Sequence, residues 1–221
     1  MLDRDFEFDE FDFFLLDTRR QRSHRKVGTL ASAELFDVDT LNRLLDWLDS
    51  TNRPKFVVSP SMVLPRHRRA VQRDGSLNAS NLSALHSDGW DGYPGTLQKV
   101  LGHIADEGIS NVVFLSGDEH RSSIASAEIF DMAGQLVTKF KSIHTAAMWA
   151  PFPFANAIDE DIVENDEFVI ESAALQQFTC KVQSRRPPRG DGPTYVSVSE
   201  DGDGWKLDCE FAGGVVETLV L

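Results

Sequence analysis

The segment 115–120, Leu-Ser-Gly-Asp-Glu-His, holds the side chains of this sequence that are best suited to chemistry. It follows the run 111–114, whose apolar residues predict a buried strand. Asp118 and His120 are therefore expected at the carboxyl edge of a sheet, where open α/β sheets bind ligands. A carboxylate and an imidazole two residues apart can bind one Zn, Mn or Fe ion. The alternative is that Asp118 caps a turn and His120 is an ordinary loop histidine.

A second cluster of polar and aromatic residues lies in segment 88–94, Asp-Gly-Trp-Asp-Gly-Tyr-Pro, ahead of an expected helix. Trp90 and Tyr93 suit a pocket wall, because each joins an apolar body to a polar tip. A helix N-terminus also attracts anions. The alternative is a capping segment in which Asp91 caps the helix and Trp90 packs as a staple. Both interpretations can hold together.

Arginines follow in two further places. Asp17-Thr18-Arg19 comes after a buried strand, and Arg19 can clamp a phosphate with two hydrogen bonds or form a structural ion pair. The run Arg-His-Arg-Arg at 66–69, with Arg73 beyond it, is the one dense basic patch. It predicts either a place that gathers an anionic substrate or a solvated surface segment.

Composition limits the partners of the chain. Its 221 residues carry 22 Lys and Arg against 35 Asp and Glu, a formal charge of −13. This balance disfavours binding to nucleic acid or to an anionic membrane, since both need a basic surface. No apolar run approaches the ~18 residues of a membrane span, and the first residues lack the pattern of a signal peptide. The sequence as written therefore predicts a cytoplasmic protein.

Other sequence features narrow the chemistry. The glycine-rich phosphate and dinucleotide motifs and the Gly-x-Ser-x-Gly nucleophile motif are absent from the sequence, which disfavours kinase-like chemistry, dinucleotide binding and serine hydrolysis. The only cysteines are Cys180 and Cys209. They are expected to be buried thiols, with a single disulfide as the alternative.

The order of elements predicts an α/β core followed by antiparallel β structure. Alternating apolar residues at 6–8 and 11–16 predict a hairpin, and helical spacing predicts a helix from a cap at Asp39-Thr40 through Ser50. Strand–helix–strand patterns predict parallel pairing. A long loop is expected at 62–91, and a surface loop at the acidic stretch 159–167. The further elements are strands at 56–59, 111–115, 124–130, 135–143, 168–170, 174–183, 194–198, 206–211 and 215–221, and a helix between Pro94 and Gly108.

Three segments taken in order resemble the PhoD-type alkaline phosphatase/phosphodiesterase family of calcineurin-like metallophosphoesterases. They are 14–19 with Arg22-Ser23, then 88–93, then 115–120. Segment 150–156 resembles a stretch that follows the core in some members, so the likeness covers roughly residues 6–156.

The resemblance implies a β sandwich flanked by helices, a polynuclear centre of Ca, Fe, Mn or Zn ions, and hydrolysis of phosphate mono- or diesters. It implies that Asp118 and His120 are metal ligands and catalytic, with Arg19 and Asp91 also in the catalytic site. Arg19, Trp90 and Tyr93 would contact the substrate. Residues 1–156 would be the C-terminal portion of the phosphatase domain, and 157–221 a β-rich extension packed on it.

The sequence departs from the family in its earlier ligand motifs. Neither Gly-Asp-x-x-Asp nor Gly-Asn-His occurs anywhere in the chain. The N-terminal part of the fold is therefore expected to be missing and the active site incomplete, because a catalytic zinc-type site takes three protein ligands. An uncovered sheet edge would favour a homo-oligomer or a second chain. The alternative function is a non-catalytic remnant, or a β-rich interaction module that keeps the fold without turnover.

Overall fold

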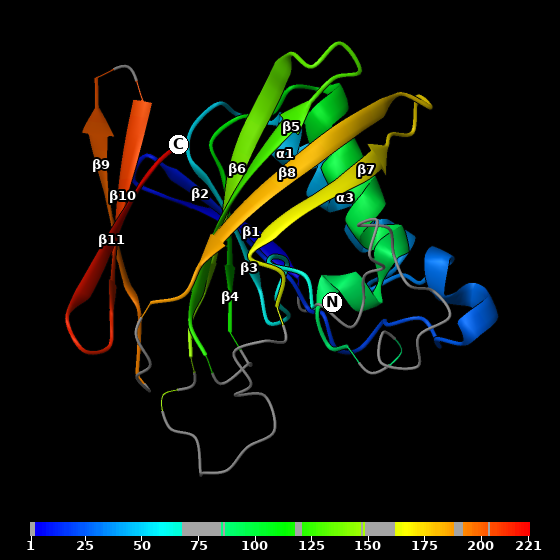
Figure 1. Ribbon diagram of the computed structural model, residues 1–221, viewed down its shortest axis with the longest axis horizontal. Helices are drawn as coiled ribbons and strands as arrows, with labels where there is room; N and C mark the ends of the chain where they lie inside the picture. Colours follow the sequence, from blue (N-terminus) through cyan, green and yellow to red (C-terminus); the bar gives the residue numbers. More distant parts are fainter. Residues whose placement is uncertain are drawn as a thin grey trace.

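The computed structural model describes residues 3–67, 85, 87–117, 121–146, 148, 162–187, 192–202 and 204–221. Within these residues, one eight-stranded sheet has the order β1-β2-β3-β4-β6-β5-β8-β7, and a separate three-stranded sheet has the order β11-β10-β9 (Figure 1). The predicted 62–91 loop is described only at 62–67, 85 and 87–91.

The first half of the large sheet is an antiparallel hairpin followed by parallel strands. β1 (Arg4–Phe8) pairs with β2 (Phe11–Leu15) in the hairpin that the alternating residues predicted. β2, β3 (Lys55–Ser59), β4 (Val112–Ser116) and β6 (Leu136–His144) then pair in parallel, each with the next. Parallel neighbours need crossover connections, and helices supply the first two.

Two helices make these crossovers. α1 (Val38–Asp49) begins after Asp37, whose carboxylate accepts the Thr40 N–H at 2.9 Å. The N-cap is thus Asp37, and the cap predicted at Asp39-Thr40 was wrong by two residues. α3 (Pro94–Asp106) has proline in its first turn, as predicted. Its N-cap residue is Tyr93, so the expectation that Asp91 caps this helix was also wrong.

The second half of the large sheet is antiparallel. β5 (Ser123–Phe130) pairs with β6 and with β8 (Gln177–Arg185), and β8 pairs with β7 (Asn165–Glu171). β7 begins inside the acidic stretch that was expected to be a surface loop, and alternate residues along it are buried. The loop prediction is therefore corrected for 165–167.

The three-stranded sheet contains β9 (Tyr195–Asp201), β10 (Gly204–Phe211) and β11 (Val215–Val220), paired antiparallel around β10. It stands on the side of the large sheet away from α1 and α3 (Figure 1). Two cores result. Residues such as Leu44, Leu101 and Phe114 pack between the helices and the large sheet, whereas Phe56, Val113 and Leu207 pack between the two sheets.

The architecture is therefore a two-sheet sandwich with helices on one outer face, which is the predicted fold class. Cys180 in β8 and Cys209 in β10 are both buried free thiols, so the disulfide alternative does not apply. Among the described residues, no helix has the length and apolar character needed to cross a membrane.

Candidate active site

Polar side chains gather where the parallel strands end. Asp17 and Thr18 follow β2, Ser59 ends β3 and Ser116 ends β4, while His144 ends β6. Because the four strands run in parallel, these residues share one edge of the sheet, here called the carboxyl edge. Open α/β sheets bind their ligands at this edge.

Two arginines hold Asp88 at the carboxyl edge. Arg19 Nη1 lies 2.6 Å from one carboxylate oxygen of Asp88, and Arg22 Nη1 bonds the other. Two further contacts hold the Arg22 side chain in place. Its Nε donates to the Thr18 carbonyl, and its Nη2 lies 2.9 Å from Ser61 Oγ. Partial burial works against the Asp88 carboxylate, but the hydrogen bonds from Arg22 and Arg19 outweigh it and lower the pKa of Asp88.

Tyr93 lies beneath two guanidinium groups. The Arg25 and Arg22 guanidinium carbons are 4.3 and 5.2 Å from the centre of the Tyr93 ring. Arg25 also donates to the carbonyls of Ser87 and Gly92, at 2.7 and 3.2 Å. Tyr93 is nearly buried, so its ring serves as a platform that holds the arginines by cation–π attraction.

Asp91 is buried and bonded to His67 and Ser87. Its Oδ2 accepts the His67 backbone N–H at 2.8 Å and lies 2.9 Å from His67 Nδ1, while its Oδ1 accepts the Ser87 hydroxyl at 2.5 Å. Burial alone would raise the pKa of Asp91. The charge and hydrogen bonds of His67, with the Ser87 hydroxyl, instead lower it to about 2. Asp91 therefore orients the His67 ring.

Trp90 packs in the core at the base of this edge. Its side chain is fully buried and meets Phe36 and Phe114 in edge-to-face contacts, with ring centres 5.8 Å apart in each case. Its indole N–H donates to Ser59 Oγ at 3.0 Å. This burial corrects the expectation of a pocket wall, because a fully buried ring offers no surface to a substrate.

The centre of the edge lies between the ends of β4 and β6. Ser116 and His144 are partners in the register of these strands, and Ser116 Oγ lies 2.9 Å from His144 Nδ1. Gly117 continues from β4, and the segment then passes to Asp118, Glu119 and His120, which lie outside the described residues.

The described residues at this edge do not form a metal centre. No group of three or more His, Cys, Asp or Glu side chains among them could hold an ion. The carboxylates present already have partners. Asp17 accepts the backbone N–H groups of Arg19 and Arg20 at 3.0 and 3.3 Å, Asp88 binds arginines and Asp91 binds His67.

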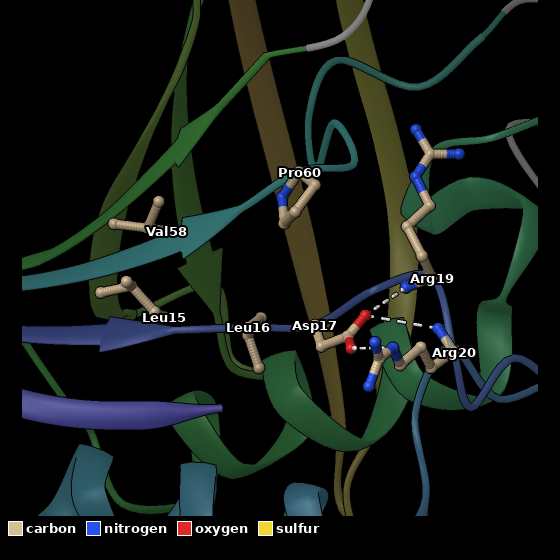
Figure 2. Close-up of a pocket in the computed structure, with 7 residues that line it drawn as sticks. All are labelled: Leu15, Leu16, Asp17, Arg19, Arg20, Val58 and Pro60. Carbon is tan, nitrogen blue, oxygen red and sulfur yellow. Dashed lines mark hydrogen bonds and ion pairs between the residues drawn. The ribbon is translucent and has the colours of Figure 1, made fainter. Parts of the chain in front are cut away.

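A cavity of about 480 Å³ opens beside Arg19 at the ends of β2 and β3. Figure 2 shows that the Asp17 carboxylate is turned onto the backbone of the next residues, whereas the Arg19 side chain extends away from it. The cavity is lined by Leu15, Leu16, Asp17, Arg19, Arg20, Val58 and Pro60. Its lining therefore combines apolar side chains with two exposed arginines.

Sequence patterns missed His67 and Ser87 as site residues and gave no role to Arg22 and Arg25. His67 and Asp91 are 24 positions apart, with most of the predicted loop between them, so spacing could not pair them. The sequence signal that could have indicated His67 was its place in the basic run 66–69. Its first member, Arg66, is buried and paired with Asp166, which rules out the anion-gathering role for that residue. Arg68, Arg69 and Arg73 lie outside the described residues.

The fold and the polar carboxyl edge define an α/β sandwich protein with an arginine-rich site. A family model described as PhoD-like phosphatase matches residues 2–167. The chain belongs to the PhoD-like phosphatase family.

A comparison with solved structures supports the sandwich fold described above. A structure entitled "Structure of PhoD" matches with a TM-score of 0.52 and 16% sequence identity, covering 99% of this chain and 41% of that chain. The present chain thus spans less than half the length of that protein. A search of curated proteins found no match.

Proposed function

We propose that this chain takes part in the hydrolysis of phosphate mono- or diesters and that Arg19 and Arg22 bind the phosphoryl group. The observation that carries the proposal is the pair of guanidiniums around Asp88 beside the cavity at the carboxyl edge. A net charge of −13 repels anionic esters elsewhere, so a local cluster of cations is needed to hold one. Family membership supports the same reaction class.

Arg19 and Arg22 would have different roles in binding the phosphoryl group. Arg22 is held by Thr18, Ser61 and Asp88, so its guanidinium is already oriented. The Arg19 side chain is 42% exposed and can exchange the Asp88 carboxylate for a phosphoryl oxygen. Arginine suits this task, because its planar fork binds two oxygens at once.

Asp118 and His120 would supply metal ligands to this site, in keeping with the family resemblance. Bound Ca, Fe, Mn or Zn ions would polarise the phosphoryl oxygens and lower the pKa of an attacking water. Two ligands are fewer than a catalytic site takes. We therefore propose that the centre becomes complete only with further ligands from outside these 221 residues, in the same polypeptide or in a second one.

A sheet edge is available for such a partner. β1 is one of the two outer strands of the large sheet, all five of its residues are exposed, and Phe6 and Phe8 are among them. Exposed strand edges with apolar side chains pair readily with another strand. A non-catalytic interaction module is the second candidate function, and this edge is the observation that favours it.

The experiment measures hydrolysis of 4-nitrophenyl phosphate and bis(4-nitrophenyl) phosphate with added Ca, Mn, Fe or Zn. Arg19→Ala should raise KM at least ~10-fold, since a charged hydrogen bond contributes ~1.5–3 kcal/mol. Arg53→Ala is the matched control, because Arg53 is 37% exposed, pairs with Glu7 and Asp12, and precedes β3 at the end of that strand away from the carboxyl edge. Asp118→Ala and His120→Ala should each abolish metal-dependent turnover.

The outcomes separate the two candidates. Metal-dependent turnover that survives both Asp118→Ala and His120→Ala would refute the metal assignment. Absence of turnover with every metal, combined with self-association in sedimentation analysis, would favour the interaction module. An Arg19→Ala effect no larger than that of Arg53→Ala would refute the phosphoryl-binding role.

A further inference from the structure

His67 and Asp91 form a hydrogen-bonded dyad whose geometry fixes the protonation of the ring. The Asp91 carboxylate is ionised and can only accept hydrogen bonds, so the proton between the two side chains belongs to His67 Nδ1. Nε2 is then the ring nitrogen that takes up and gives back a proton.

The dyad is held more tightly than a surface pair. Asp91 Oδ2 receives both the backbone and the ring of His67, and Ser87 occupies the other oxygen. The side chains of Asp91 and His67 are 2% and 19% exposed. His67 therefore stays within reach of solvent while its partner does not.

The dyad lies on the two segments that the phosphoryl-binding arginines contact. Ser87 directly precedes Asp88, which binds Arg19 and Arg22. On the other segment, Ser61 lies beside Arg22, and Leu64 bonds Ser142 two residues before the end of β6. Arg66, the residue before His67, is paired with Asp166.

We propose that His67 is the proton donor to the leaving oxygen of the ester, a role that rests on the proposed function. Water forms the new P–O bond, and the bond to the leaving oxygen breaks with its electron pair on that oxygen. The proton on His67 Nε2 passes to the leaving oxygen, and the ring recovers a proton from the attacking water. Asp91 and Ser87 are positioning residues that hold the ring for this transfer.

A leaving-group series tests the proposal. His67→Gln should slow hydrolysis of phenyl phosphate by about 100-fold or more, the usual contribution of general acid catalysis. It should change hydrolysis of 2,4-dinitrophenyl phosphate by less than about threefold, because that leaving group departs without a proton. A merely structural role for His67 would lower both rates alike.

A matched control is available in α3. His103 Nε2 lies 2.9 Å from Asp49, and the His103 side chain is 21% exposed, so it forms a similar pair remote from the carboxyl edge. His103→Gln should leave both rates unchanged. Because His67→Gln leaves Asp91 buried without its cation, the double variant His67→Gln/Asp91→Asn keeps a neutral pair and should show the same leaving-group dependence.

NMR of ¹⁵N-labelled histidine separates this proposal from the proposed function. Inorganic phosphate should shift the His67 Nε2 signal and leave His103 unchanged. If the wild-type chain hydrolyses no ester, the proposed function fails, and a phosphate-dependent His67 shift would still support the position of the dyad at an oxyanion site. Equal losses on both esters in an active enzyme, or no His67 shift with phosphate, would overturn the proposal.

Discussion

Arg66 and Asp166, one hundred positions apart in the chain, form a buried ion pair with two hydrogen bonds, at 2.6 and 2.8 Å. The Arg66 guanidinium carbon also lies 4.1 Å from the centre of the Phe168 ring. This pair ties the segment after β3 to β7 at the far edge of the large sheet. It thereby places His67, the next residue, against Asp91.

Breaking this pair should cost far more than losing an exposed one. Asp166→Ala leaves Arg66 buried with its principal partner gone, which costs about 3–5 kcal/mol of unfolding free energy. Glu167→Ala is the control, because Glu167 is exposed and its pair with Lys181 spans 3.7 Å. Urea denaturation measures both. The double variant Arg66→Met/Asp166→Leu should recover most of the loss, and a loss as large as that of Asp166→Ala alone would contradict the desolvation argument.

The sequence predicted the elements whose signals are local. The hairpin of β1 and β2, the crossover helices and the parallel strands follow from alternation, helical spacing and the proline at the start of α3. The acidic stretch was misassigned, because composition outweighed alternation. Asp166 lies two and four positions before Phe168 and Ile170, so it shares their buried face, and its charge is balanced by a residue that no local pattern could name.

For segment 88–93, the sequence predicted the position better than the contacts. Segment 88–93 does lie at the carboxyl edge. However, Trp90 is buried in the core, and Asp91 binds His67 and does not cap α3. Both errors have one physical cause. Tertiary partners from segments 18–25 and 59–67 satisfy these side chains, and sequence spacing carries no information about such partners.

Asp91 should make the unfolding free energy depend on pH in the acid range. Its pKa is lowered from 3.8 to about 2 in the folded protein, so the folded state binds a proton less readily than the unfolded state. The resulting stabilisation is present above about pH 4 and is lost as the pH falls from there to about 2. Its size is on the order of 2 kcal/mol.

Urea denaturation between pH 2 and pH 5 measures this effect. The unfolding free energy of Asp91→Asn should fall less steeply than that of the wild-type protein over this range. Parallel curves for the two proteins would show that Asp91 does not carry the linkage.

Gly92 should not tolerate a side chain. A Cβ atom built there would clash with Arg25 Nη1 and would lie 2.6 Å from the Ser87 carbonyl oxygen. The carbonyl belongs to the backbone and cannot move aside cheaply, so Gly92→Ala should cost about 1–3 kcal/mol of unfolding free energy, as overpacking does. It should also raise KM for phosphate esters, because displacing Arg25 from Tyr93 disturbs the ring over which Arg22 also lies. Gly28→Ala is the control, since no atom lies within 4 Å of a Cβ there, and equal stability of the two variants would refute the packing argument.

Cys180 and Cys209 should be inert in the folded protein. Burial raises the pKa of Cys180 well above its ordinary value and that of Cys209 to about 12. At pH 8 a thiol of pKa 12 is ionised to only about one part in ten thousand, and the thiolate is the reactive form. DTNB should therefore label neither cysteine until guanidinium unfolds the chain, when both react. Cys209→Ser leaves one thiol to react on unfolding, which assigns the signals, and rapid labelling of the native protein would show that β8 or β10 opens far more readily than their packing implies.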